Sequence, residues 1–329
     1  MDAFKVYLIE AAGDTVRAGF ASLERARMDP GDVVVRIRDA SVNYKDALAA
    51  TGKGKIIRRF PCVGGIDAAG TVESSQSSRF KPGDSVIVHG HGFGVSQHGG
   101  YAEFTRVPAD WVNRVPPPLT GLDAITIGVA GYTAALGIDL MELNGTRPDR
   151  GRVLVNGATG GVASISIDIL AQRGYEVVAV TSKPEQAQYL KELGASEVIA
   201  ASDLPAATRP LEKALWAAAI DSLGGEPLAA LTRTMHKDGV IASIGNAAGL
   251  DLTTTVMPFI LRGVRLIGVN SDNEPAVREH VWQRLSTDLR PRHLARIAHV
   301  TPFASLPDAI AEVVAGRNTG RRVIEVNAV

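Results

Sequence analysis

Short apolar runs separated by turn-forming residues dominate the first third of the chain. Such runs occur at 33–37, 70–72 and 85–88, and a Pro-Gly-Asp triplet stands at 30–32 and again at 82–84. Proline, glycine and aspartate in this arrangement are typical of tight turns. Short strands joined by tight turns pack as antiparallel sheets. We therefore expect a β-rich, antiparallel and partly barrel-like domain in this part of the chain.

The pattern changes in the middle of the chain, where apolar strands alternate with helices. Strands are expected at 152–156, 176–181, 197–200, 217–221, 240–244 and 265–270. A glycine-rich segment at 157–164 opens the first helix, and a second helix is expected at about 184–193. Alternation of this kind predicts a parallel, doubly wound sheet. Ligands of such sheets bind at the carboxyl ends of the strands.

The last part of the chain predicts two helices, at 279–289 and 306–315, and a final strand at 322–326. We expect this tail to return to the first domain. The predicted fold class is therefore α/β, with a β-rich domain formed by 1–124 and 275–329. A doubly wound parallel-sheet domain is predicted at 125–274.

Composition agrees with two globular domains. The chain has 329 residues, of which 45% are hydrophobic and 21% are charged, and 35 basic residues balance 35 acidic residues. A neutral chain offers no general electrostatic attraction to nucleic acid or to an anionic membrane. We find no apolar run of the roughly 20 residues that span a bilayer. The first 14 residues also lack the basic, apolar and small-residue regions of a signal peptide. We expect a cytoplasmic protein with neither partner.

The glycine-rich segment is the first candidate binding site. Thr159, Gly160, Gly161 and Val162 lie between a predicted strand and a predicted helix. Glycines let the backbone approach a pyrophosphate, and the helix N-terminus supplies N–H donors. The strict G-x-G-x-x-G spacing is not met, so the position between strand and helix carries the prediction of a dinucleotide site. The alternative is a plain glycine turn.

The end of the second predicted strand indicates which dinucleotide binds. A site for NAD usually has an acidic residue there, about 20 residues after the glycines, that binds the ribose hydroxyls. This chain has Thr181, Ser182 and Lys183 instead. Two hydroxyls and a cation suit a 2′-phosphate, so the sequence favours NADPH. The alternative is that Lys183 is a solvated charge at the start of a helix.

Several segments together resemble a known family. They are Asn43–Ala47, Thr51–Ile56, Gly65–Gly70, Gly131–Ala134, Gly157–Val162 and Thr254–Val264. The chain resembles the medium-chain dehydrogenase/reductase superfamily, and within it the acrylyl-CoA reductase and quinone oxidoreductase subfamily. The resemblance implies a GroES-like catalytic domain and a Rossmann domain. It also implies NADPH-dependent reduction of acryloyl-CoA to propionyl-CoA, with hydride transfer to Cβ and protonation of Cα.

The zinc enzymes of the superfamily carry a cysteine in the first of these motifs and Gly-His-Glu in the second. Here the corresponding positions hold Tyr44 and Lys45, and then Gly65-Ile66-Asp67. We therefore expect no catalytic metal. His89, His91 and His98 lie in one glycine-rich loop, but no cysteine or clear carboxylate completes a metal site there. We expect this loop to line the pocket. Cys62 is expected to be an inert buried thiol.

The resemblance also suggests roles for single residues. Tyr44 is expected at the nicotinamide end of the cofactor, Asn43 as a hydrogen-bond donor to the thioester oxygen, and Asp67 as an anchor for Lys45 or for this network. The alternative for each is a structural hydrogen bond in the barrel core. Further cofactor contacts are expected at Thr133, Asn270 and Arg322, and the neighbouring Arg321 matches the same basic position.

A basic cluster and an apolar strand suggest partners. Lys53, Lys55, Arg58 and Arg59 would suit the phosphates of coenzyme A, and the alternative is a solvated loop. The strand at 265–270 is expected at a sheet edge, where pairing with a second copy would form a homodimer. Two other functions stay open. One is an NADPH-dependent quinone or 2-alkenal reductase, and the other is a non-catalytic NADPH-binding regulatory protein.

Overall fold

The structure of the protein is a computed structural model that describes residues 3–204 and 207–327. Contacts between Cα atoms divide the chain into two compact units. Unit 1 comprises Met1–Val129, Asp272–Trp282 and Leu294–Val329, of which 1–2 and 328–329 lie outside the described residues. Unit 2 comprises Ala130–Ser271 and Gln283–His293.

Strands are the main regular structure in the described part of unit 1. Its strands are β1 (Ala3–Ala12), β2 (Thr15–Glu24), β3 (Val33–Val42), β4 (Cys62–Val63), β5 (Asp67–Ser75), β6 (Ser85–His89), β7 (Phe104–Val107), β8 (Val112–Arg114), β15 (Ala298–Pro302) and β16 (Arg321–Glu325). One sheet has the order β2–β1–β4. The other has the order β15–β16–β3–β5–β6–β8, with β7 also paired to β3. Apart from the parallel pair β15–β16, these pairings are antiparallel.

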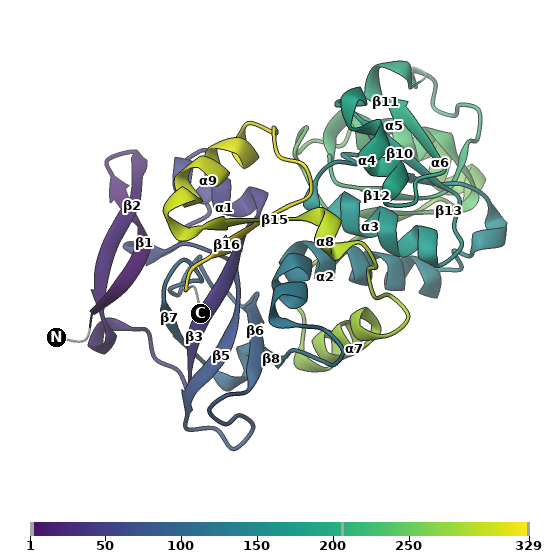
Figure 1. Ribbon diagram of the computed structural model, residues 1–329. Coiled ribbons are helices and arrows are strands. Elements are labelled where there is room, and N and C mark those ends of the chain that lie inside the picture. Colours follow the sequence, from purple (N-terminus) through teal and green to yellow (C-terminus); the bar gives the residue numbers. More distant parts are fainter. Residues whose placement is uncertain (1–2, 205–206, 328–329) are drawn as a thin grey trace. The chain divides into compact units, whose positions relative to one another are not determined.

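The central strand β3 shows how this unit forms its core. Val33, Val35 and Ile37 are fully buried, whereas Arg36 and Arg38, which alternate with them, are exposed. Alternation with a period of two places the apolar side chains on one face of the sheet. The helices that lie wholly in this unit are α1 (Tyr44–Thr51), α8 (Leu294–Ile297) and α9 (Leu306–Val314), with short helices η1 (Arg25–Arg27), η2 (Ala109–Trp111) and η6 (Phe303–Ser305). Figure 1 shows α9 beside α1, which it contacts.

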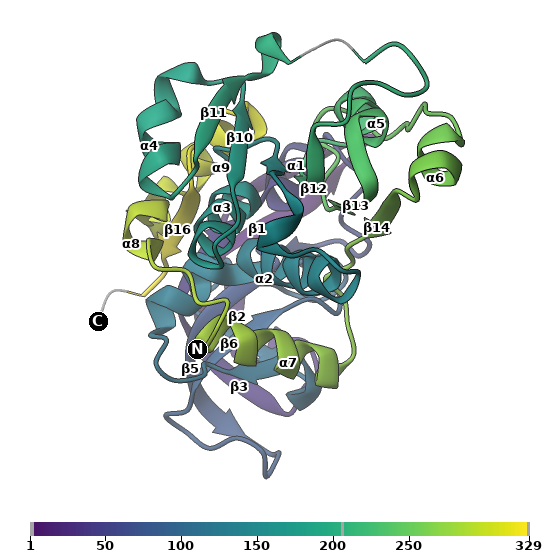
Figure 2. The ribbon, with the colours of Figure 1, turned by 90° about the vertical axis from the view of Figure 1, so that its right-hand side faces the viewer.

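Unit 2 contains a parallel sheet, as the strand–helix alternation predicts. Its strands are β9 (Val153–Val155), β10 (Val177–Thr181), β11 (Glu197–Ala200), β12 (Trp216–Asp221), β13 (Met235–Ser243) and β14 (Arg265–Gly268). They follow the order β11–β10–β9–β12–β13–β14, and Figure 2 labels β11 and β10 on one side of the sheet and β12, β13 and β14 on the other. All pairings are parallel, and β9 and β10 are buried throughout. Burial of both faces explains why these strands are continuous apolar runs.

Helices connect the strands of this sheet. They are α3 (Gly161–Gln172), α4 (Ala187–Glu192), α5 (Gly225–Thr234) and α6 (Met257–Arg262), with short helices η3 (Pro148–Arg150), η4 (Pro184–Gln186) and η5 (Ala201–Asp203). The crossover from β9 to β10 runs across the sheet in the opposite direction to that from β12 to β13. Right-handed crossovers therefore place α3 and α5 on opposite faces. This confirms the predicted α/β fold with a doubly wound sheet.

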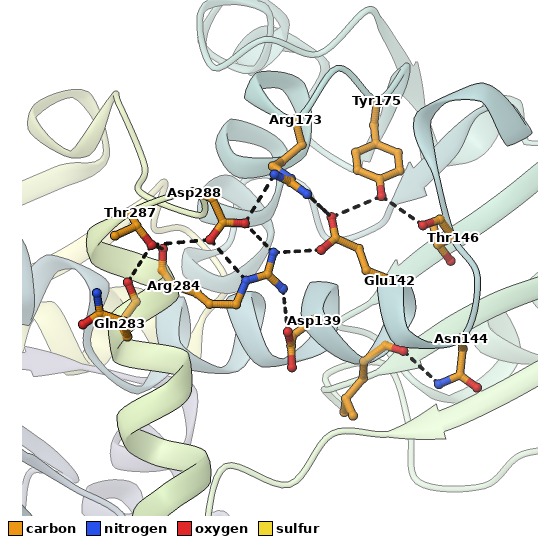
Figure 3. A network of polar contacts seen from close by, with 11 residues as sticks. Asp139, Glu142, Asn144, Thr146, Arg173, Tyr175, Gln283, Arg284, Thr287 and Asp288 are labelled. Carbon is orange, nitrogen blue, oxygen red and sulfur yellow. Dashed lines mark hydrogen bonds and ion pairs between the residues drawn. The ribbon is translucent and has the colours of Figure 1, made fainter.

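Helix α7 (Pro275–Ser286) leads into a segment that joins unit 2. Figure 3 shows how Arg284 fastens it: the guanidinium bonds to Asp139 at 2.5 Å, to Glu142 at 2.9 Å and to Asp288 at 2.5 Å. Arg173 adds a second bond to Glu142 at 3.0 Å. The segment 283–293 lies inside the tail that the sequence pattern assigns to the first domain. These ion pairs are the physical reason why it groups with unit 2.

Helix α2 (Gly121–Leu143) corrects one expectation. It is long and apolar enough to span a membrane by length and composition, whereas the sequence analysis found no such run. However, 89% of its apolar window is buried in the protein, and Gly128 interrupts the helical geometry with φ 49° and ψ −156°. Both features are typical of a core helix. The three acidic residues inside this helix hid it from a search for an uninterrupted apolar run.

Candidate active site

The glycine-rich turn of unit 2 lies at the carboxyl end of β9. Gly157 has a φ of +58°, which glycine adopts readily, and its carbonyl accepts a hydrogen bond from Gly160 N–H at 2.8 Å. Gly160 is the N-cap of α3, which begins at Gly161. The predicted segment Thr159–Val162 therefore presents the N-terminal N–H groups of a 12-residue helix. This arrangement can bind a phosphate.

A buried pair beside this turn was missed by the sequence analysis. Asn156 Nδ2 donates to Asp221 Oδ1 at 2.5 Å, and Asn156 Oδ1 accepts from the N–H of Ser222 at 2.7 Å. The other oxygen of Asp221 accepts from Gly224 N–H at 3.0 Å. Burial raises the pKa of this carboxyl. The pair fixes the loops that follow β9 and β12. The available signal was a polar residue at the end of each of two apolar strands.

The residues expected at the adenosine end lie on the strand next to β9. Thr181 ends β10, and its Oγ1 accepts a hydrogen bond from Lys183 N–H at 3.0 Å. Ser182 is exposed, and Lys183 is the N-cap of η4. Elsewhere in unit 2, Thr133 is buried on α2, and the exposed Asn270 follows the end of β14. Their roles toward a cofactor stay predictions.

In unit 1, two of the three residues expected to be catalytic, Asn43 and Asp67, belong to a buried polar network. Asp67 starts β5 and accepts hydrogen bonds from several groups. Its donors are Ser41 Oγ at 2.5 Å, Val129 N–H at 2.8 Å, Asn43 Nδ2 at 3.2 Å and Arg321 Nη2 at 3.4 Å. Asp67 is fully buried and Arg321 is 3% exposed. An ion pair at this depth needs such additional hydrogen bonds to offset the loss of hydration.

Asp67 pairs with Arg321 and anchors the network around Asn43, which is the second of its two expected roles, whereas the expected contact with Lys45 is not formed. Lys45 is exposed on helix α1. Arg321 lies at the start of β16, which pairs with β3 so that Arg322 is opposite Val42. The sheet register therefore carries the guanidinium of Arg321 to Asp67. Its burial lowers its pKa, and the charge of Asp67 acts in the opposite direction.

The side-chain amide of Asn43 uses its oxygen and both of its N–H groups in hydrogen bonds within this network. Its Oδ1 accepts from Arg321 Nη1 at 2.8 Å, and its Nδ2 lies 3.1 Å from Asp46 Oδ2 and 3.2 Å from Asp67 Oδ2. An amide has two N–H donors, so both are occupied. The expected donation to a thioester oxygen would require one of these bonds to break. Asp46 also accepts from the N–H of Asn43 at 2.9 Å. Burial, and then the charge of Asp67, raise the pKa of Asp46 to about 7.

Tyr44 differs from its neighbours because it is accessible. It is the first residue of α1, directly after the N-cap Asn43, and it is 40% exposed. Its hydroxyl can therefore reach a bound molecule while the network fixes the backbone beside it. By contrast, Arg322 forms an ion pair with Glu312 of α9 at 2.7 Å. Its expected contact with a cofactor phosphate stays a prediction.

The basic cluster divides into two parts. Arg59 Nη2 lies 2.6 Å from Oδ1 and 2.7 Å from Oδ2 of Asp29, so this arginine compensates a buried carboxylate. Lys53, Lys55 and Arg58 are exposed, and the residues at 3–204 and 207–327 supply none of them with an ion-pair partner. These three cations are available to an anionic ligand.

The histidines of the glycine-rich loop face different partners. Trp282 Nε1 donates to His89 Nε2 at 3.0 Å, and burial lowers the pKa of His89 well below its ordinary value. His91 stacks on Trp111 with ring centroids 5.4 Å apart. His98 Nδ1 accepts from Val63 N–H at 3.0 Å. The three rings therefore serve separate contacts rather than one common site.

The chain is similar to known proteins over nearly its whole length. Residues 29–117 match the family described as alcohol dehydrogenase GroES-like domain, and residues 161–287 match the family described as zinc-binding dehydrogenase. Acrylyl-CoA reductase AcuI of Ruegeria pomeroyi is 40% identical over 97% of this chain and 97% of its own length. The yhdH oxidoreductase from Salmonella enterica, solved in complex with NADP, is 42% identical, with a TM-score of 0.95 over 98% of this chain and 100% of that one.

A third relative introduces a different substrate and a different cofactor. YhfP of Bacillus subtilis, whose name contains the words quinone oxidoreductase, is 40% identical over 98% of this chain and 99% of its own length. Its crystal structure, with NAD bound, has a TM-score of 0.95 over 99% of this chain and 100% of that one. Relatives of similar identity thus differ in the named substrate and in the bound dinucleotide.

The second family description names zinc, which requires several His, Cys, Asp or Glu side chains close together. Among the described residues, no group of three or more His, Cys, Asp or Glu side chains is placed to hold a metal ion. Cys62 is buried against the carbonyl oxygens of Val63 and Gln97, and burial raises the pKa of its thiol to about 12. Thiolate is the form that binds zinc. These residues do not fit a zinc ion.

Proposed function

Since the chain belongs to the medium-chain dehydrogenase/reductase superfamily, in its acrylyl-CoA reductase and quinone oxidoreductase branch, we propose that it reduces acryloyl-CoA to propionyl-CoA with NADPH. Membership of this superfamily makes the protein an oxidoreductase. The observation that carries the choice of a coenzyme A thioester is the set of exposed cations at Lys53, Lys55 and Arg58. They follow α1, the helix that Tyr44 begins.

NADPH is the cofactor that the edge of the parallel sheet supports best. The turn at Thr159–Val162 supplies helix N–H groups for the pyrophosphate. Thr181, Ser182 and Lys183 replace the acidic residue that would bind the ribose hydroxyls of NAD. A cation and two hydroxyls attract a 2′-phosphate, whereas a carboxylate would repel it. NADP in the Salmonella enterica relative agrees with this choice, and NAD in YhfP makes it worth testing.

The cofactor supplies a hydride to Cβ of the acryloyl group. The pair of the C=C bond would then form a double bond between Cα and the thioester carbon, while the carbonyl pair moves onto the oxygen. As the carbonyl reforms, the enolate pair takes up a proton at Cα, for which water is one source. Tyr44 donates a hydrogen bond to the oxygen as negative charge develops there. Donors placed in advance stabilise such a charge more than they stabilise the substrate. Asn43 and Asp67 contribute by holding this part of the chain rather than by contacting the substrate.

We also propose that two copies pair through β14. This strand pairs with β13 on one side, and the segment before it exposes several apolar side chains: Leu250, Val256, Met257, Ile260 and Leu261. An apolar edge of this kind is covered in stable proteins. The proposed complex is a homodimer in the cytoplasm, where the single thiol stays reduced. Its mass in solution, measured by light scattering, tests this.

The test of the proposed function is the oxidation of NADPH in the presence of acryloyl-CoA, crotonyl-CoA, acrolein and a benzoquinone in parallel. We expect the highest kcat/KM for acryloyl-CoA, at about 10⁴ M⁻¹s⁻¹ or above, which is the ordinary range for enzymes. The highest value with the quinone would make the name of YhfP the better guide. Stoichiometric NADPH binding without turnover of any acceptor would indicate a regulatory protein.

A further inference from the structure

Helix α2 is kinked at the point where the buried network touches it. Gly128 interrupts the helix, and the adjacent Val129 N–H donates to Asp67 Oδ2 at 2.8 Å. On the other side of the kink, Thr126 C=O accepts from Arg321 Nε at 3.0 Å. The ion pair thus binds one donor and one acceptor of the interrupted helix. Sharp kinks persist where such groups find other partners.

The same two residues hold the start of α1. Arg321 Nη1 donates to Asn43 Oδ1, and Asp67 Oδ2 accepts from Asn43 Nδ2. Ser41 joins the two, because its hydroxyl donates to Asp67 and accepts from Arg321 Nη2 at 2.5 Å. Asn43 is the N-cap residue, so its position sets the direction in which Tyr44 leaves the helix end. One ion pair therefore controls both the kink and the backbone at Tyr44.

We propose that Asp67 and Arg321 are positioning residues, which fix the hydroxyl of Tyr44 through Asn43 and brace the kink of α2 at the same time. This inference rests on the function proposed above, because it gives Tyr44 a task in the reaction. Neither charged group touches the substrate. Both are fully or almost fully buried, and both act through side chains and backbone of the same unit. A misplacement of about 1 Å at a reacting group can lower a rate about a hundredfold.

A double-mutant cycle tests this proposal. We expect Asp67→Asn to lower kcat at least about tenfold in the wild-type background, and less than about twofold when Tyr44→Phe is already present. The KM for NADPH stays unchanged in both. Asp168→Asn is the matched control, because Asp168 is also fully buried but lies on α3 with His293 as its partner. We expect the fold losses in kcat from Asp168→Asn and from Tyr44→Phe to multiply in the double variant, as they do for independent sites. An equal loss from Asp67→Asn in both backgrounds overturns the proposal.

A second measurement does not depend on activity. All six tyrosines lie within the described residues, and apart from Tyr44 they are at most 6% exposed. Nitration with tetranitromethane therefore modifies Tyr44 selectively, and its rate reports how firmly this residue is held. We expect faster nitration in Asp67→Asn and no change in Asp168→Asn. An unchanged rate in Asp67→Asn contradicts the positioning role.

The experiment stays decisive if a variant does not fold or if the wild type lacks the proposed activity. If Asp67→Asn does not fold, Ser41→Ala replaces it in the cycle, because it removes the hydrogen bonds that join the Ser41 hydroxyl to Asp67, Arg321 and Asn43 and leaves the direct contact between Asp67 and Arg321. The same non-additivity with Tyr44→Phe is expected, and additivity overturns the proposal.

If the wild type does not reduce acryloyl-CoA, the proposed function fails by itself. The cycle is then run with the acceptor that the protein does reduce, and nitration tests the positioning in either case.

Discussion

Arg321 Nη1 donates a hydrogen bond to Asn43 Oδ1 at 2.8 Å, although 278 positions separate the two residues in the chain. The antiparallel pairing of β16 with β3 brings them together. The C-terminal strand thereby supports the N-terminal end of α1, where Tyr44 stands. A change in the last strand is therefore expected to alter chemistry at the first helix.

The kink of α2 leads to a prediction about stability. A Cβ atom at position 128 would lie 2.4 Å from Asp67 Oδ2 and 2.6 Å from Arg321 Nη2, and the φ there is +49°. We expect Gly128→Ala to lower the free energy of unfolding by about 2–4 kcal/mol, as measured by urea denaturation. Gly13→Ala is the control, because Gly13 has a φ of +62° and nothing within 4 Å of the added Cβ. Equal losses in the two variants would mean that the network imposes no constraint on this position.

Lys183 gives a prediction about cofactor choice. Lys183→Glu replaces a cation with a carboxylate next to the expected 2′-phosphate, so we expect the KM for NADPH to rise by about tenfold or more. The KM for NADH should change little, because that cofactor lacks the phosphate. Initial rates measured with both cofactors separate the two effects. Equal changes for both would remove Lys183 from the 2′-phosphate site.

The exposed cations after α1 give a prediction about the substrate. We expect the triple variant Lys53→Gln, Lys55→Gln, Arg58→Gln to raise the KM for acryloyl-CoA several-fold and to leave the KM for acrolein unchanged. The physical reason is the loss of attraction to the phosphates of coenzyme A, which acrolein lacks. The matched control replaces the exposed residues Lys81, Lys191 and Lys213 by Gln, and so removes the same charge elsewhere. A similar rise in that control would point to net charge rather than to a site.

Asp46 gives a prediction about pH. Its pKa is raised to about 7, from an ordinary value of 3.8. A carboxyl with a raised pKa holds its proton more tightly in the folded state, so its contribution to stability falls as the pH rises from about 4 to about 7. Asp46→Asn does not titrate. Its stability relative to the wild type should therefore increase over this range, by up to about 1.4 kcal/mol per pH unit. Parallel curves for the two proteins would contradict the shift.

The regular parts of the fold could be predicted from the sequence because their signals are local. The apolar runs and the glycines after β9 identified the parallel sheet and the turn before α3. Helix α4 is preceded by η4 rather than forming one continuous helix, since Pro184 starts a tighter turn. Such differences affect boundaries and leave the architecture unchanged.

The contacts at the candidate site could not be predicted because they join distant positions. Nothing in the local pattern pairs Asp67 with Arg321, 254 positions further along, and the resemblance suggested Lys45 or the surrounding network as its partner. Only the register of β16 on β3 decides between them. The kink at Gly128 could not be predicted either, because a glycine inside an apolar helix has no sequence signature that marks a kink.

The burial of Cys62 also determines whether the proposed substrate could react with the protein's thiol. Acryloyl thioesters are electrophilic alkenes that alkylate thiolates irreversibly. This sequence has one cysteine, its side chain is fully buried, and the pKa of its thiol is about 12. Burial therefore keeps the thiol in its protonated form, which is the unreactive one. With acryloyl-CoA as the proposed substrate, the burial of this thiol would protect the protein from alkylation by the molecule that it reduces.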